Sequence, residues 1–138
     1  MYKLILYFVL GTYLSANSLQ TQEMSTDEMK KQNRIIVKLA SEEISKTLPQ
    51  NIDKYTTLQR VEGKDTKLIY IYEINTGAKS DESIRNEDRS RMQQAVTNGI
   101  CKSSKRFLDA KIDIAYLYRS ATSKEKLFIF NVSQKDCI

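Results

Sequence analysis

Two alternating segments constrain the fold more than any other feature of the sequence: residues 67–75 (KLIYIYEIN) and 111–119 (KIDIAYLYR). In each, large apolar or aromatic side chains recur at every second position, which places them on one face of an extended strand. Both segments are rich in β-branched and aromatic residues, which favour strands. We therefore expect two strands that each bury one face.

Each of these strands is expected to lie between a helix and a second strand. Apolar side chains at about every fourth position predict a first helix that begins after the N-cap residue Ser25 and ends before Pro49. Its apolar positions are Ile36, Val37, Leu39, Ala40, Ile44 and Leu48. A second helix is predicted over residues 87–108, and two shorter strands are predicted over residues 56–62 and 126–133.

The predicted order is therefore α-β-β-α-β-β, which is a helix followed by a hairpin, twice. Strands joined by short turns pair antiparallel. We expect an α+β fold: a four-stranded antiparallel sheet with two helices packed on one face. The halves share a Tyr-x-Tyr element, which is either a trace of duplication or the result of two similar half-buried aromatic strands. Because the likeness is only local, the second interpretation is favoured.

The N-terminus has the layout of a secretory signal peptide. One positive charge, Lys3, precedes the apolar run of residues 4–10, and the small residues Ala16 and Ser18 precede the expected cleavage site after Ser18. The apolar stretch is about half the length that a spanning helix needs, although an uncleaved anchor is the alternative. We expect a signal peptide over residues 1–18, a flexible leader over 19–24 and a single α+β domain over 25–138, exported to the periplasm.

Export gives the two cysteines, Cys101 and Cys137, a structural meaning. In an oxidising compartment an even number of cysteines indicates a disulfide, and two cysteines allow one intramolecular pairing. In a reducing compartment they would more often be free buried thiols. We predict a structural disulfide that ties the second helix to the C-terminal end of the chain.

A longer set of motifs resembles a family of small exported bacterial proteins. Residues 48–58 (LPQNIDKYTTL) match the LPxx[IV]DxxTxL segment of that family. The later matches are, in order, Tyr70 and Tyr72, Cys101, Tyr116 and Tyr118, and Asp136 with Cys137. The resemblance covers roughly residues 35–138; it implies export, one domain and the Cys101–Cys137 bridge, but no activity and no catalytic residues.

The composition argues against catalysis. With no histidine, the chain lacks Ser-His-Asp and Cys-His nucleophile systems and His-ligated metals, and its four glycines form no phosphate-binding loop. The acidic residues fall on predicted helix faces or loops, where solvated charge is the usual role, and Ser123 and Lys126 match S-x-x-K only within a predicted turn. We predict no catalytic residue, no metal site, no cofactor and no enzyme.

Four tyrosines form a possible binding face: Tyr70, Tyr72, Tyr116 and Tyr118. If the helices cover this face of the sheet, the tyrosines are core residues whose hydroxyls reach an edge. If the face is open, it becomes an aromatic platform for a peptide or a glycan. The core interpretation is favoured because a small sheet needs a buried face.

The net charge of +5 allows an anionic surface or an acidic wall polymer as a partner. Lys102, Lys105 and Arg106 form the tightest basic cluster, a possible basic patch, although basic residues at a helix end are usually solvated. Nucleic acid is disfavoured by the expected compartment and by the mixing of the two signs of charge.

We therefore expect a non-catalytic exported protein-interaction domain that binds another envelope or secreted protein, either as an accessory to an assembly or as an inhibitor or immunity-like protein. The alternative is a module that binds a small ligand or the cell wall through the tyrosine face, or an unrecognised hydrolase. The sequence does not indicate an oligomeric state.

Overall fold

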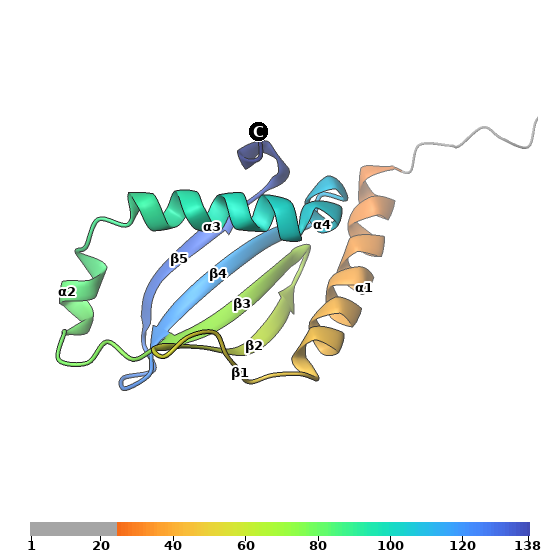
Figure 1. The fold of residues 1–138 in the computed structure, drawn as a ribbon. Helices are drawn as coiled ribbons and strands as arrows, with labels where there is room; N and C mark the ends of the chain where they lie inside the picture. The colour runs from red at the N-terminus through yellow and green to blue at the C-terminus, as the bar shows by residue number, and fades with distance from the viewer. Residues whose placement is uncertain (1–24) are drawn as a thin grey trace, which may run out of the picture.

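The computed structural model describes residues 25–138, so the predicted signal peptide and leader lie outside the described residues. Figure 1 shows a curved sheet with helices packed against it. The elements in chain order are α1 (Thr26–Ser45), β1 (Gln50–Asn51), β2 (Thr56–Lys64), β3 (Lys67–Ile74), α2 (Asp81–Arg85), α3 (Ser90–Ser103), α4 (Lys105–Asp109), β4 (Asp113–Ser120), β5 (Lys126–Val132) and the 3-10 helix η1 (Gln134–Asp136).

The predicted α+β class is confirmed, but the predicted sheet is wrong in two respects. The sheet has five strands in the order β1-β2-β3-β4-β5, because the two-residue strand β1 pairs with β2. It is mixed rather than antiparallel: the β2–β3 and β4–β5 hairpins are antiparallel, whereas the central pair β3–β4 is parallel.

The parallel pair follows from the connection between the hairpins. Parallel neighbours need a crossover that returns the chain to the starting end of the sheet. Residues 75–112 form this crossover and contain α2, α3 and α4. The short turns predict only the pairing within each hairpin, and the longer connection determines how the hairpins meet.

The helices also differ from the predicted pair, since residues 25–138 contain four. The short helix α2 forms before the predicted second helix, with Ser80 as its N-cap through a hydrogen bond from the Ser83 N–H to Ser80 Oγ (3.1 Å). The predicted second helix is divided at Ser104, whose φ and ψ of −115° and 21° are not helical. The short helix α4 then places Leu108 in the core.

Helix α1 begins as predicted and ends early. The Glu28 N–H donates to Ser25 Oγ at 3.2 Å, which satisfies one of the free amides of the first turn. The helix ends at Ser45, before the predicted end at Leu48. None of the helices in residues 25–138 has both the length and the apolar character needed to cross a membrane.

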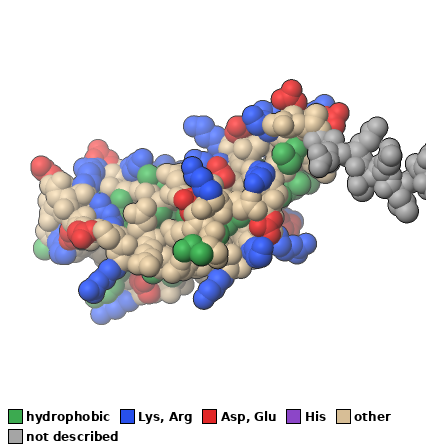
Figure 2. Space-filling model, turned by 90° about the horizontal axis from the view of Figure 1, so that it is seen from above, with side chains coloured by type: hydrophobic (Ala, Val, Ile, Leu, Met, Phe, Trp, Pro, Cys, Tyr) green, Lys and Arg blue, Asp and Glu red, His purple; other side chains and the backbone are tan. Residues whose placement is uncertain are grey.

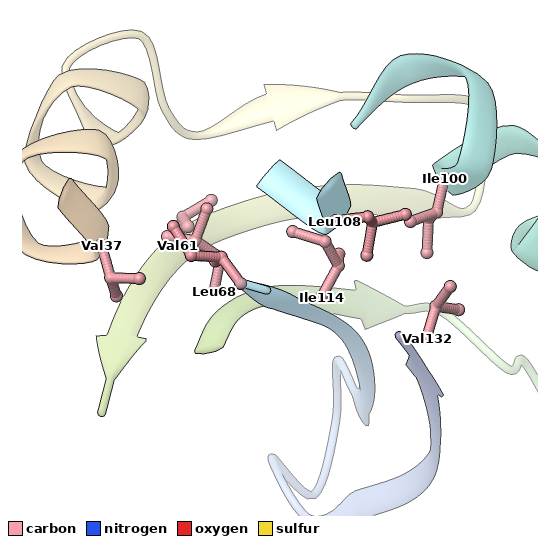
Figure 3. Packing of buried hydrophobic residues seen from close by; sticks show 8 residues of the cluster. Val37, Val61, Leu68, Ile100, Leu108, Ile114 and Val132 are labelled. Atoms are coloured by element: carbon pink, nitrogen blue, oxygen red, sulfur yellow. The ribbon is translucent and has the colours of Figure 1, made fainter. Parts of the chain in front are cut away.

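One apolar cluster joins the helices to the sheet. Its members include residues of α1, β2, β3, α3, α4, β4 and β5, and Figure 3 shows seven of them in a row from Val37 to Val132: Val37, Val61, Leu68, Ile114, Leu108, Ile100 and Val132. Each is at most 5% exposed. Because burying apolar area contributes about 25 cal/mol per Å², this cluster stabilises the packing of the helices on the sheet.

Gly63 allows α1 to pack closely on β2. A Cβ at this position would lie 2.7 Å from Val37 Cγ1 and 3.1 Å from the Val37 carbonyl oxygen. The second contact is with helix backbone, which cannot move aside as a side chain can. The glycine therefore sets how near α1 approaches the sheet.

We expect Gly63→Ala to lower the free energy of unfolding by about 1–3 kcal/mol, because overpacking forces the helix to shift. Urea unfolding followed by circular dichroism measures this change. Gly99→Ala is the matched control: a Cβ there meets no atom within 4 Å, and Gly99 lies inside α3, so alanine should stabilise the protein by up to about 1 kcal/mol. Equal effects of the two substitutions would contradict the role given to Gly63.

Candidate functional site

The two Tyr-x-Tyr elements lie side by side at the centre of the sheet. Tyr70 pairs with Tyr116 and Tyr72 with Tyr118 in the parallel β3–β4 register. The ring centroids are 5.2 Å apart for Tyr70 and Tyr116 and 4.8 Å apart for Tyr72 and Tyr118, which stack. Phe128 of β5 continues the stack at 4.7 Å from Tyr118. The sequence predicted that the four tyrosines line one face of the sheet, and in the structure their rings lie next to one another.

This tyrosine face is the face on which the helices pack. Tyr72 and Tyr118 are 7% and 6% exposed and belong to a second apolar cluster with Leu58 and Phe130. Tyr70 and Tyr116 pack against the main cluster and stay half-buried. The packing favours the core interpretation for Tyr72 and Tyr118, and leaves only Tyr70 and Tyr116 with surface for a partner.

Burial changes the acidity of these phenols. Desolvation, followed by the neighbouring Tyr116, raises the pKa of Tyr118 to about 12. Desolvation also raises the pKa of Tyr72 far above its ordinary value, and it raises the pKa of Tyr70 with a contribution from Tyr116. The neutral phenols are therefore the stable forms in the folded protein, and none of these three tyrosines is poised to act as a base near neutral pH.

The predicted disulfide is present and joins α3 to the segment after η1. Cys101 and Cys137 are linked, with Cα atoms 5.6 Å apart. A cleft of about 490 Å³ opens beside the bridge, lined by Lys102, Lys105 and Asp109 and by residues near the C-terminus. The bridge holds the C-terminal segment as one wall of this cleft.

The predicted basic patch is divided between two helices. Lys102 lies in the last turn of α3, whereas Lys105 and Arg106 lie in α4. Lys105 Nζ is 2.7 Å from Asp109 Oδ2, so its charge is partly neutralised. Figure 2 shows Lys and Arg side chains spread over the face seen from above, with Asp and Glu among them. The arrangement is that of solvated helix ends rather than a concentrated cationic surface.

The acidic residues of the described range, 25–138, do not converge on a reaction centre. Glu43 pairs with Lys46 and Glu87 with Lys79, each at an exposed site. Ser123 donates to Asp81 Oδ2 at 2.6 Å on the surface. Within residues 25–138, no group of three or more Cys, Asp or Glu side chains is arranged to hold a metal ion.

Sequence reasoning missed an exposed apolar surface on α1. Leu39 was expected to support the buried stripe, but it is 59% exposed, and Ile35 is 55% exposed. Val37, which lies between them in sequence, is 1% exposed, so the two faces of α1 are distinct. The signal that could have found this surface is the spacing of Ile35 and Leu39, four residues apart on the side opposite Val37.

The family comparison covers most of the described fold. A family described as a domain of unknown function (DUF8479) matches residues 19–128. The chain belongs to the DUF8479 family. No curated protein sequence matches the chain.

Three solved structures share the fold of this DUF8479 member. A candidate secreted protein from Pseudomonas aeruginosa has a TM-score of 0.71 at 12% identity, covering 80% of this chain and 96% of its own. The type 2 secretion system pilotin EpsS of Vibrio vulnificus has a TM-score of 0.66 at 12% identity, covering 81% and 97%. The type II secretion system pilotin AspS of Vibrio cholerae has a TM-score of 0.63 at 17% identity, covering 83% and 100%.

We expect the double variant Cys101→Ser/Cys137→Ser to lose about 4 kcal/mol of unfolding free energy, because the bridge closes a loop with a sequence separation of 36. Urea unfolding of the oxidised protein and of the variant measures the difference. Reduction of the unmodified protein should produce the same loss and should leave the variant unchanged. A variant as stable as the oxidised protein would contradict a structural role for the bridge in this DUF8479 member.

The tyrosines predict a loss of stability at alkaline pH. The pKa of Tyr118 is raised on folding, so its contribution is complete below pH 10, where the unfolded phenol is also neutral, and it is lost as pH rises toward 12. Over this window, ionisation of the unfolded state should lower the unfolding free energy by about 1.4 kcal/mol per pH unit for this group. Tyr118→Phe should show a shallower decline in urea titrations at pH 10, 11 and 12; an identical slope would contradict the assignment.

Proposed function

We propose that the chain is a non-catalytic, exported protein-interaction domain that binds a protein of the bacterial envelope or of a secretion machinery, as an accessory to its assembly. The observation that carries this proposal is the fold: two type II secretion pilotins align with more than four-fifths of this chain. The alignments cover 97% and 100% of the two solved pilotin chains, so the likeness extends across those chains rather than a short shared piece.

Export is supported by three independent features. The signal-peptide pattern of residues 1–18 ends at Ser18, and the family match begins at residue 19. The Cys101–Cys137 bridge suits an oxidising compartment. One structural neighbour is described as a candidate secreted protein.

A half-buried apolar surface offers a place for the partner. It is made of Ile36 and Ala40 of α1, Tyr70 of β3, Val96 of α3 and Tyr116 of β4, and we call it the inter-helix surface. These side chains pack against the main cluster while each keeps part of its area in solvent. A partner bound here would bury apolar surface against side chains whose positions are already fixed by packing on the core.

The accessory role is favoured over the inhibitor or immunity-like role because the neighbours that carry a functional name are pilotins. The tyrosine-platform alternative is weakened by the burial of Tyr72 and Tyr118, which removes half of the predicted face from solvent. A hydrolase is weakened by the dispersed, exposed carboxylates and by the raised pKa of the tyrosines.

We expect the mature protein, tagged at its C-terminus and isolated from periplasmic extract of the source bacterium, to retain one envelope or secretion protein in near-stoichiometric amount. Ala40→Glu should lower the recovery of that protein about tenfold, because it places a charge on the inter-helix surface. Quantitative mass spectrometry of the eluates measures both results.

The matched control is Ala78→Glu, which adds the same charge at an exposed turn after β3. Both variants should show the circular dichroism spectrum of the parent protein. Recovery of no protein in stoichiometric amount, or equal losses with the two variants, would contradict the proposed function and its surface.

A further inference from the structure

The outer face of α1 is exposed and apolar at its centre. Ile35 and Leu39 rank among the most exposed large apolar side chains of the described residues, at 55% and 59%. In Figure 1, α1 forms one end of the molecule and α2 the other, and the main contacts of α1 with other elements are to β2 and β3. The helix therefore anchors itself through one face and presents the other outward.

The outward residues follow a coiled-coil spacing. Successive members are separated alternately by four and three residues, which keeps them in line along a helix. We call this row the α1 outer seam; all of its members are exposed, and they are Glu28, Gln32, Ile35, Leu39, Glu42 and Lys46. Lys46 follows the helix as its C-cap with helical φ and ψ of −61° and −27°, so the row continues to this residue.

We propose that two copies of the chain associate through their α1 outer seams, antiparallel about a two-fold axis. With the axis level with residue 37, Ile35 of each copy packs against Leu39 of the second copy, which gives two equivalent apolar layers. Such an isologous contact is self-complementary, as closed dimers require. The occupant of this apolar face is thus a second copy of the same chain.

The charges of the seam favour this direction over parallel in-register pairing. Antiparallel pairing places Glu28 opposite Lys46 of the second copy, at the two ends of the seam. It also brings Lys31, on one flank of the seam, to within one residue's rise (about 1.5 Å) of the level of Glu42 of the second copy, on the same flank. Each pair occurs twice by symmetry, whereas parallel in-register pairing would place every one of these charges opposite its own copy and repel.

These charges are free to meet a second copy. Lys31 and Glu42 take part in none of the ion pairs found among residues 25–138. Lys46 contacts Glu43 of its own helix at 2.7 Å, but the two side chains are 70% and 74% exposed, so this pair is weak and exchangeable. The pairing therefore requires no buried contact of the monomer to break.

The contact is small, so the dimer is expected to be weak and reversible. Two apolar layers on a helix of 20 residues bury less than a standard interface of about 1,600 Å². We expect a dissociation constant on the order of tens to hundreds of micromolar. The seam adjoins the inter-helix surface, since Ile36 and Ala40 line one hollow with Leu39, Glu42 and Lys46, but the association is proposed without reliance on the proposed function.

Sedimentation equilibrium of the mature, oxidised protein from about 5 µM to 1 mM tests the proposal; the range brackets the expected constant. The average mass should rise from monomer to dimer, and Leu39→Glu should weaken association about tenfold or more. Ile52→Glu is the matched control, because Ile52 is 51% exposed but lies outside α1, and it should leave association unchanged.

A charge-reversal cycle tests the direction. Lys31→Glu alone and Glu42→Lys alone should each weaken association several-fold, because each places like charges opposite one another. The double variant Lys31→Glu/Glu42→Lys restores both pairs and should recover the parent constant. Lys102→Glu, which makes the same charge change on α3, controls for net charge and should have little effect.

A protein that stays monomeric at 1 mM would overturn the proposal. So would a dimer that Leu39→Glu leaves intact, since the contact would then use another surface. If the losses of affinity caused by Lys31→Glu and by Glu42→Lys simply add in the double variant, the antiparallel arrangement is wrong. All variants are compared only where their circular dichroism spectra match that of the parent, and Ile35→Ser serves as the second probe of the seam if Leu39→Glu does not fold.

Discussion

The parallel pairing of β3 with β4 is the interaction on which the rest of the structure depends. Parallel neighbours require a long crossover, so the chain must leave the sheet after β3 and return to its starting end before β4. Residues 75–112 do this, and on the way they place α3 and α4 against the sheet. The same pairing brings the two Tyr-x-Tyr elements into register, so that four rings form one continuous aromatic layer under those helices.

Local physical chemistry predicted the strands well because their side-chain alternation is a property of the strand itself. All four predicted strands occur, with ends within about two residues of the expected positions. The Ser25 cap was predictable for the same reason, since the hydroxyl acts on an amide of its own helix. The direction of the β3–β4 pair was not, because it is decided by the connection between hairpins. Strand β1 was missed because two exposed residues carry no periodicity.

In the candidate site, too, the features set by local sequence were predictable and those set by distant elements were not. Alternation correctly placed the tyrosines of each strand on one face, but whether that face is covered depends on helices distant in sequence. The division at Ser104 was equally invisible: residues 90–109 carry an almost unbroken helical pattern, yet Leu108 reaches the core only because the chain turns there. Leu39 was assigned to the buried stripe because Ile36 and Ala40 adjoin it on the helix, and only the docking of α1 through Val37 shows that it points outward.

Helix α1 therefore has two different sides: the inner side packs closely on the sheet, and the outer side is exposed to solvent. Its inner side packs closely on β2 because Gly63 has no side chain there, and this close approach buries Val37 in the core. An outer side with no role would be expected to be polar, because exposed apolar residues add nothing to the stability of a monomer. Ile35 and Leu39 depart from that expectation. They lie in line along the helix, and the charges on either side of residue 37 have opposite signs. A dimer formed there would present two inter-helix surfaces in one assembly, and two weak sites held together can retain a multivalent partner far longer than one.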